Sequence, residues 1–262
     1  MSLTLFDLSL LLATGLGAGF LAGLLGVGGG LIIVPILISW LIHKGQYEHH
    51  AHIAIATSLV VMIPTALASV RAHWYKNAIE SQFALFLTPG LLVGSVIGAL
   101  FALSLDGLIL VRFFTLFVFS AALQLAFGRR SSESINSMAS YKDSLTGSII
   151  GAISAIVGIG GGSMTVPWLI HRGINTTRAV ATSSIGTLTI AIASATTYLI
   201  IPWAQNQESL IDWQVVALIA VPATLIAPFG AYVAHKVPAD KLRKIFALFL
   251  FIVAIKLSFS AF

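Results

Sequence analysis

Residues 26–35 read GVGGGLIIVP, and residues 158–167 read GIGGGSMTVP. The two segments are identical at six of ten positions, and each lies inside a long apolar stretch, approximately 5–42 and 144–170. Several glycines in succession interrupt helical hydrogen bonding, because glycine takes left-handed backbone conformations at little steric cost. Such a segment either packs tightly within one long helix or forms the tip between two helices that run in opposite directions.

Two further pairs of segments repeat in the same order along the chain. Ala56-Thr57-Ser58 recurs as Ala181-Thr182-Ser183, and residues 112–127 match residues 244–259 at seven of sixteen positions. The three pairs keep nearly the same spacing, so the matches stay collinear apart from small insertions or deletions. Collinear repeats of this kind indicate an internal duplication. We therefore divide the chain into two homologous halves, 1–128 and 144–262, joined by a polar linker, 129–143.

The composition predicts that these halves lie in a membrane. Of the 262 residues, 58% are hydrophobic and 9% are charged, whereas a soluble domain is about 25% charged. The absence of cysteine excludes disulfides, thiolate metal sites and a cysteine nucleophile. Eight apolar stretches follow one another, and a helix needs about 20 residues to cross a bilayer. We expect an all-α polytopic protein of the plasma or inner membrane, whose net charge of +5 arises from its loops rather than from nucleic-acid binding.

Lysine and arginine decide between the two interpretations of the glycine segments. If each segment lay inside one long crossing helix, the two membrane faces would carry six and eight basic residues, which is no bias. If each segment is the tip of a hairpin that enters and leaves on the same side, the division becomes eleven to three. The positive-inside rule favours the second arrangement. It predicts two inverted halves, each a hairpin plus three transmembrane helices, with a cytoplasmic linker and both termini outside.

The glycine tips are the predicted substrate site. A broken helix leaves backbone N–H groups without helical partners, and the helix that follows presents its positive dipole end at the same place. Such a tip binds anions, and two inverted tips that meet near mid-membrane are typical of transporters. The alternatives are glycines that only allow helix packing, and a nucleotide loop, which lacks a preceding strand pattern here. The tip residues that we assign to the site are Gly28, Gly29, Gly30, Gly160, Gly161, Gly162 and Ser163.

Hydroxyl side chains gather in the apolar segment that follows each tip. Thr57-Ser58 and Thr182-Ser183 occupy equivalent positions of the repeat, and Ser184 follows the second pair. We expect these five hydroxyls to donate hydrogen bonds to the anion, although bonds to their own helix backbone are the alternative. No lysine or arginine lies within five residues of either tip, so neutral donors should hold the anion.

Four other features carry weaker expectations. We interpret Glu48-His49-His50-Ala51-His52 as a solvated outer loop rather than a metal site or a pH sensor, and Lys256 as a snorkelling residue at a helix end. Trp40 lies at a segment end, as expected of an interfacial tryptophan, as do Trp74, Trp203 and Trp213, whereas Trp168 could line the site. No cofactor, metal or catalytic residue is predicted, because Ser163 lacks the second glycine of a serine nucleophile turn.

The two tips, each followed by an Ala-Thr-Ser step, make the chain similar to the sulfite exporter TauE/SafE family over nearly its whole length. The resemblance implies an integral membrane permease for small anions, often sulfur oxyanions or organosulfonates, that works in the export direction. Alternating access coupled to a proton or ion gradient, or uncoupled, would suit it, because no ATP-driven motor motif is present. The alternative functions are an anion channel and a non-transporting scaffold subunit, and the oligomeric state stays open.

Overall fold

The computed structural model describes residues 3–26, 28–46, 49–127, 139–205, 208–234, 248 and 250–255, and every regular element within them is a helix. Six of these helices are long and apolar enough to cross a membrane, namely α1, α3, α4, α5, α8 and α9. This confirms the predicted all-α polytopic fold. The helices are α1 (Leu5–Leu25), α2 (Gly30–His43), α3 (His50–Trp74), α4 (Ser81–Leu103), α5 (Gly107–Phe127), α6 (Lys142–Val157), α7 (Gly162–His171), α8 (Thr176–Ala204) and α9 (Trp213–Ala234).

Each glycine segment separates two helices rather than lying inside one. Helix α1 ends at Gly26 with φ +67°, and α6 ends at Gly158 with φ +74°. Gly29 and Gly161, with φ +77° and +69°, then precede α2 and α7. Positive φ at all four positions explains why glycine occupies them. The alternative of one continuous helix through each segment is therefore wrong for both hairpins.

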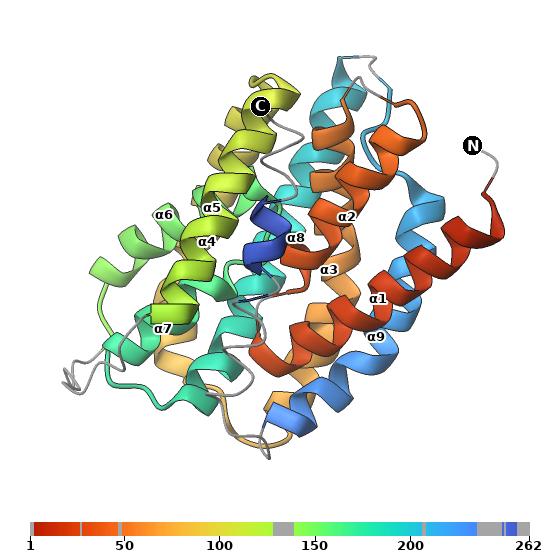
Figure 1. The fold of residues 1–262 in the computed structure, drawn as a ribbon. Coiled ribbons are helices and arrows are strands. Elements are labelled where there is room, and N and C mark those ends of the chain that lie inside the picture. Colours follow the sequence, from red (N-terminus) through yellow and green to blue (C-terminus); the bar gives the residue numbers. More distant parts are fainter. Residues whose placement is uncertain are drawn as a thin grey trace.

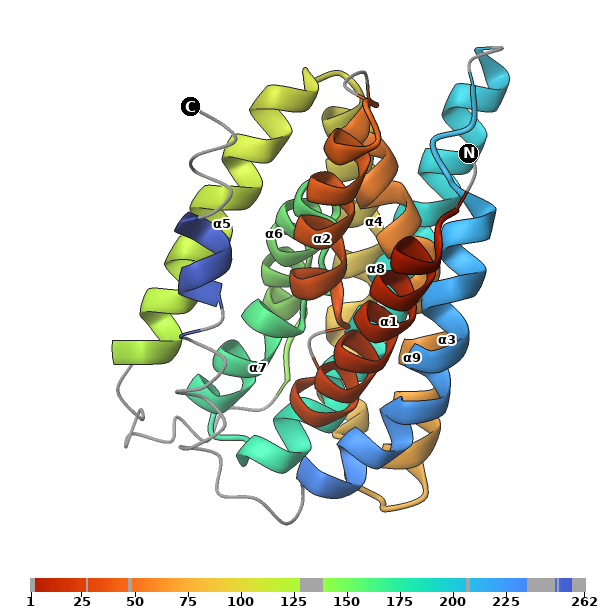
Figure 2. The same cartoon turned by 45° about the vertical axis from the view of Figure 1, so that its right-hand side comes forward.

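The two hairpins enter the helical bundle from opposite ends (Figures 1 and 2). Helix α1 starts at the end that holds the α2–α3 and α8–α9 connections, whereas α6 starts at the end that holds the α3–α4 and α7–α8 connections. Helices α3 and α8 pack against each other in the middle, beside the glycine tips.

Each entering arm packs closely along a helix from the other half. Helix α1 runs beside α9, and α4 runs beside α6. A Cβ atom built on Gly23 of α1 would lie 1.9 Å from the Ala227 carbonyl oxygen, and one on Gly90 of α4 would lie 1.8 Å from that of Ser144. At these positions the two backbones lie so close that only glycine fits between them. Close approach at small residues is how helices associate in membranes. The halves are therefore interlocked.

Two expectations about single residues are wrong. His52 lies in α3 rather than in a solvated loop: it is buried, and its Nε2 lies 3.2 Å from the Ala102 carbonyl oxygen, whereas His49, just before the helix, is exposed. Trp40 is also buried, because its indole N–H binds Asp7. Lys256, most of the linker and most of the last predicted helix lie outside the described residues.

Candidate functional site

The two glycine tips touch each other at the centre of the molecule. A Cβ atom on Gly30 would lie 2.3 Å from the carbonyl oxygen of Gly158, and one on Gly28 would lie 3.1 Å from the Cα atom of Gly160. The six predicted glycines are all buried, and Ser163, at the start of α7, is partly buried. The starts of α2 and α7 therefore approach one another inside the protein, and the amide of the third residue of each helix already donates to Gly29 O or Gly161 O.

Serine hydroxyls from α3 and α8 lie beside the opposite half's tip. Ser58 Oγ donates to the carbonyl oxygen of Gly158 at 2.8 Å. Its repeat equivalent, Ser183 Oγ, lies 3.4 Å from the corresponding carbonyl of Gly26, although its closer acceptor is Val180 O at 2.8 Å. Thr187 Oγ1 also donates to Gly26 O, at 3.1 Å. These hydroxyls bind carbonyls of the tips, not the amides.

Thr57 and Thr182 have a different role from their serine neighbours. Thr57 Oγ1 accepts a hydrogen bond from the backbone N–H of Asp212 at 3.2 Å, just before α9. Thr182 Oγ1 accepts the equivalent bond from the N–H of Glu80 at 2.9 Å, just before α4. Both threonines therefore hold the start of a neighbouring helix. Ser184 Oγ donates to Ala181 O in its own helix, at 2.6 Å.

A narrow space lies beside the first tip. Its empty volume is about 160 Å³, too narrow at every point to admit a water molecule. Ala22, Gly26, Gly28, Ala66, Ser69, Ser184 and Thr187 line it. Of the lining residues, sequence analysis assigned only Gly28 and Ser184 to the site.

Sequence analysis missed an ion pair at the base of each hairpin. Asp7, in the first turn of α1, binds Lys44 Nζ at 2.5 Å, and its other oxygen accepts from the Trp40 indole at 2.8 Å. Asp143, in the first turn of α6, binds Arg172 at 3.4 Å. Both aspartates are buried. Each pair joins the start of the entering arm to the residue that ends the returning arm.

The sequence does contain a signal for these pairs. Residues 40–45 read WLIHKG, and residues 168–173 read WLIHRG, identical at five of six positions. The second copy lies about one helical turn nearer to its glycine tip than the first copy does. When the two halves are aligned on their glycine tips, the two copies therefore fall out of register. Trp168, which could line the site by its sequence position, has the Arg172 guanidinium over its ring at 5.3 Å.

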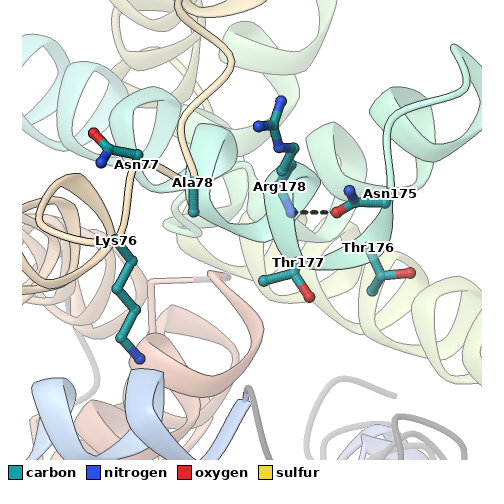
Figure 3. A pocket seen from close by; sticks show the side chains of 7 residues that line it. All are labelled: Lys76, Asn77, Ala78, Asn175, Thr176, Thr177 and Arg178. Atoms are coloured by element: carbon teal, nitrogen blue, oxygen red, sulfur yellow. Dashed lines mark hydrogen bonds between the residues drawn. The ribbon is translucent and has the colours of Figure 1, made fainter.

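A larger cavity opens at the end of the molecule where the α3–α4 and α7–α8 connections meet (Figure 3). Its volume is about 560 Å³. Lys76 and Arg178 bring two positive charges to it; Arg178 pairs with Glu80, and Lys76 Nζ lies 5.6 Å from the centre of the Tyr232 ring. The residues that line the cavity are Lys76, Asn77, Ala78, Asn175, Thr176, Thr177 and Arg178.

Comparison with known proteins agrees with this architecture. The profile of the family described as sulfite exporter TauE/SafE matches residues 11–257. A "probable membrane transporter protein" of Haemophilus influenzae is 31% identical over 95% of this chain and 97% of its own length. One of Xylella fastidiosa is 30% identical over 94% of each chain, and one of Methanocaldococcus jannaschii is 26% identical over 90% of each. No solved structure matches the chain. The match over nearly the whole length shows that this multi-pass protein belongs to the TauE/SafE sulfite exporter family of membrane transporters.

Proposed function

We propose that the protein exports small anions, of the sulfite or organosulfonate class, with the anion bound at the two glycine tips. The contact between the tips carries this proposal. There, the first-turn amides and positive dipole ends of α2 and α7 converge with the hydroxyls of Ser58, Ser183 and Ser184. Thr57 and Thr182 support the site from the starts of α9 and α4.

Alternating access is the mechanism that best fits a closed site between interlocked halves. The space beside the tips is too narrow for a water molecule, so the tips must move apart before an anion can bind between them. Helix α1 of the first half packs on α9 of the second half, and helix α6 of the second half packs on α4 of the first half in the equivalent way. Two equivalent packings supply the two states in which each end could open in turn. The driving force would be a proton or ion gradient, or the anion's own gradient.

The proposed orientation has inverted halves and a cytoplasmic linker. The start of α6 and the α3–α4 and α7–α8 connections share one end (Figure 1). Among the described residues, that end carries Arg71, Lys76, Lys142, Arg172 and Arg178, whereas the end with the start of α1 carries Lys44 and Arg112. The positive-inside rule assigns the more basic end to the cytoplasm.

The charge at the two mouths supports export rather than uptake. Lys76 and Arg178 line the cavity at the proposed cytoplasmic mouth. At the other mouth, the equivalent positions of the repeat carry no positive charge. Aligning the glycine tips matches Lys76 with Glu208, and aligning the Ala-Thr-Ser steps matches Arg178 with Ile53. Positive charge raises the local concentration of anions, and negative charge lowers it. The cytoplasmic mouth therefore favours loading, and the outer mouth favours release.

Flux measurements in proteoliposomes test this function. Vesicles loaded with sulfite should take up labelled sulfite against its gradient by counterflow, and protein-free vesicles should not. Saturable counterflow supports a carrier. Conductance without counterflow would make the protein a channel, and absence of flux for sulfite, sulfonates and carboxylates would make it a scaffold subunit.

A further inference from the structure

We propose that the anion passes to and from the glycine tips along two buried helix faces, one on α3 and one on α8, whose polar groups are Ser69, Ser194 and Tyr198. This inference rests on the proposed function and names the route that leads to its site. The clearest observation is on α8. Ser194 and Tyr198 are 0% and 1% exposed, and neither hydroxyl makes a hydrogen bond with any described residue.

Two unpaired hydroxyls in consecutive turns of one helix are an exception, because most buried polar groups, tyrosine hydroxyls included, have a hydrogen-bond partner. The helix itself offers acceptors. Thr189 and Thr197, which lie nearby on α8, donate to carbonyls of their own helix at 3.0 and 2.9 Å. A hydroxyl that stays unpaired in one state of a protein is stabilised in another state in which water or a ligand pairs it. We therefore infer that this face of α8 meets water and the anion when its end of the molecule opens.

Thr187, on the same face of α8, marks the place where this face meets the tips. Its Oγ1 donates to Gly26 O at 3.1 Å and also to Gly160 O, so it contacts both tips. Ser194 lies seven residues, or about two helical turns, beyond Thr187, and Tyr198 lies about one turn further on. Residues at these spacings share one face of a helix. The two unpaired hydroxyls therefore lead from the tips toward the α8–α9 connection.

Helix α3 carries the equivalent face in the first half. Aligning the Ala-Thr-Ser steps matches Ser69 with Ser194, and Ser69 is also buried, 2% exposed, with an Oγ that bonds no described residue. Its position relative to the tips is the same. Met62 lies at the first tip, since a Cβ atom on Gly28 would be 2.9 Å from its Sδ, and Ser69 follows seven residues later. An unpaired hydroxyl that recurs at the equivalent position of both halves indicates a shared function rather than a local fault in packing.

The two faces lead from the tips to opposite ends of the molecule. The face of α3 runs toward the α3–α4 connection, where Lys76 and Arg178 line the larger cavity, and Ser69 lies seven residues before Lys76. The face of α8 runs toward the α8–α9 connection at the other end (Figure 1). Hydroxyls suit such a route, because each offers an anion a neutral hydrogen bond that is weak enough to release it. One face would be open while the other is closed, as alternating access requires.

Thiol labelling tests the route, because the chain has no cysteine of its own. Ser69→Cys and Ser194→Cys are made singly in the full-length protein, and each membrane face is exposed in turn to sulfonatoethyl methanethiosulfonate, a small impermeant anion that reacts with thiols in water. We expect Ser194→Cys to react only from the face that labels the exposed loop variant Ser209→Cys, and Ser69→Cys only from the opposite face. The cationic trimethylammonium analogue should react about tenfold more slowly at both buried positions, because the route selects anions.

Two matched controls should stay unlabelled from either face. Ser95 is 0% exposed like Ser194, but its Oγ donates to Leu91 O at 2.5 Å, and it lies where α4 packs on α6. Ile192 of α8 is 47% exposed on the side opposite to Ser194, where we expect lipid. If Ser69→Cys and Ser194→Cys also stay unlabelled while Ser209→Cys reacts, the route is refuted. Equal labelling of Ser95→Cys, or equal rates for the two reagents, would likewise replace the anion route with general loosening of the bundle.

Tyr198→Phe removes one hydroxyl from the route and keeps the ring. We expect it to lower sulfite flux several-fold with a Tm that stays the same or increases, because the hydroxyl it removes is buried and unpaired. Thr197→Val should keep the flux, since the Thr197 hydroxyl binds its own helix. Wild-type flux in Tyr198→Phe would overturn the role of Tyr198. Labelling needs no transported substrate, so a wild type that transports none of the tested anions but labels as expected would refute the proposed substrate and support the route.

Discussion

The two hairpins are built alike but differ in length by one helical turn in each arm. The entering arm runs from Asp7 to Gly26 in the first hairpin and from Asp143 to Gly158 in the second, which is four positions shorter. The returning arm, from Gly29 to Lys44 or from Gly161 to Arg172, shortens by four positions as well. Four residues make roughly one turn of a helix, a rise of about 6 Å. Each ion pair nevertheless joins the base of its hairpin.

This difference separates what the fold requires from what it tolerates. The tips still touch, so the meeting point of the glycines is maintained while the depth of the base is not. A deletion of one whole turn in both arms keeps every side chain on the same helix face, which explains why Trp168, His171 and Arg172 repeat the order of Trp40, His43 and Lys44. The pairs themselves differ, because Asp7 also binds Trp40 whereas Arg172 also stacks on Trp168.

The largest effect should come from a side chain at either tip. Gly29→Val and Gly161→Val should each abolish transport, because valine disfavours positive φ and its Cβ would lie 2.9 Å from Ala18 O or 2.4 Å from Ile190 Cδ1. Gly17→Val is the control, since a Cβ there has nothing within 4 Å. Sulfite flux and membrane insertion are measured for all three. Normal flux in either tip variant would reduce the glycines to packing residues.

The next effect concerns the two ion pairs. Asp7→Asn should lower the Tm in detergent by several degrees, and more than Asp143→Asn does, because Asp7 meets lysine at 2.5 Å and tryptophan at 2.8 Å, whereas Asp143 meets arginine at 3.4 Å. Leaving a partly buried cation without its partner destabilises the fold in either case. Equal losses in Tm would mean that the shorter hairpin relies on its pair as much as the longer one.

How far these features follow from sequence depends on helix geometry. The positions of the tips and the fold class could be predicted from glycine spacing and hydropathy. The hydroxyl assignments were less specific, because adjacent helical residues point about 100° apart, so Thr57 and Ser58 could not both face a tip. Ser69, eleven residues after Ser58, returns to the same face after three turns, and this spacing is a signal that sequence analysis did not use. The direction of each hydrogen bond needed the structure.

Orientation can be measured at two equivalent loop positions. Asn77 and Ser209 correspond to each other by the spacing of the tips, both are exposed, and the chain has no cysteine of its own. Asn77→Cys should react with an impermeant maleimide only from the cytoplasmic face, and Ser209→Cys only from outside, if the halves are inverted. Labelling of both from one face would contradict the inversion.

The charges at the mouths should have effects of a few-fold. Lys76→Gln should raise the KM for sulfite offered at the cytoplasmic face about threefold at low salt, and the effect should shrink as ionic strength screens it. Glu208→Gln should leave that KM unchanged and lower the KM for sulfite offered outside. Flux is measured in vesicles of known orientation. If the changes in KM caused by these two substitutions do not depend on salt concentration, the electrostatic argument for export fails.

The smallest effect, and the one on which the halves should agree, is that of Thr57→Ala and Thr182→Ala. Each threonine accepts one backbone N–H bond at the start of a helix, at 3.2 Å from Asp212 or 2.9 Å from Glu80, and both side chains are buried. Losing one neutral bond of this kind costs about 1 kcal/mol. We expect the two variants to lower the Tm by similar small amounts and to leave the KM for sulfite nearly unchanged, because neither bond involves a tip. The double variant should add the two losses, since the threonines hold different helices. A rise in KM of about tenfold in either variant would instead place the threonine hydroxyls, which keep a hydrogen to donate, among the groups that bind the anion.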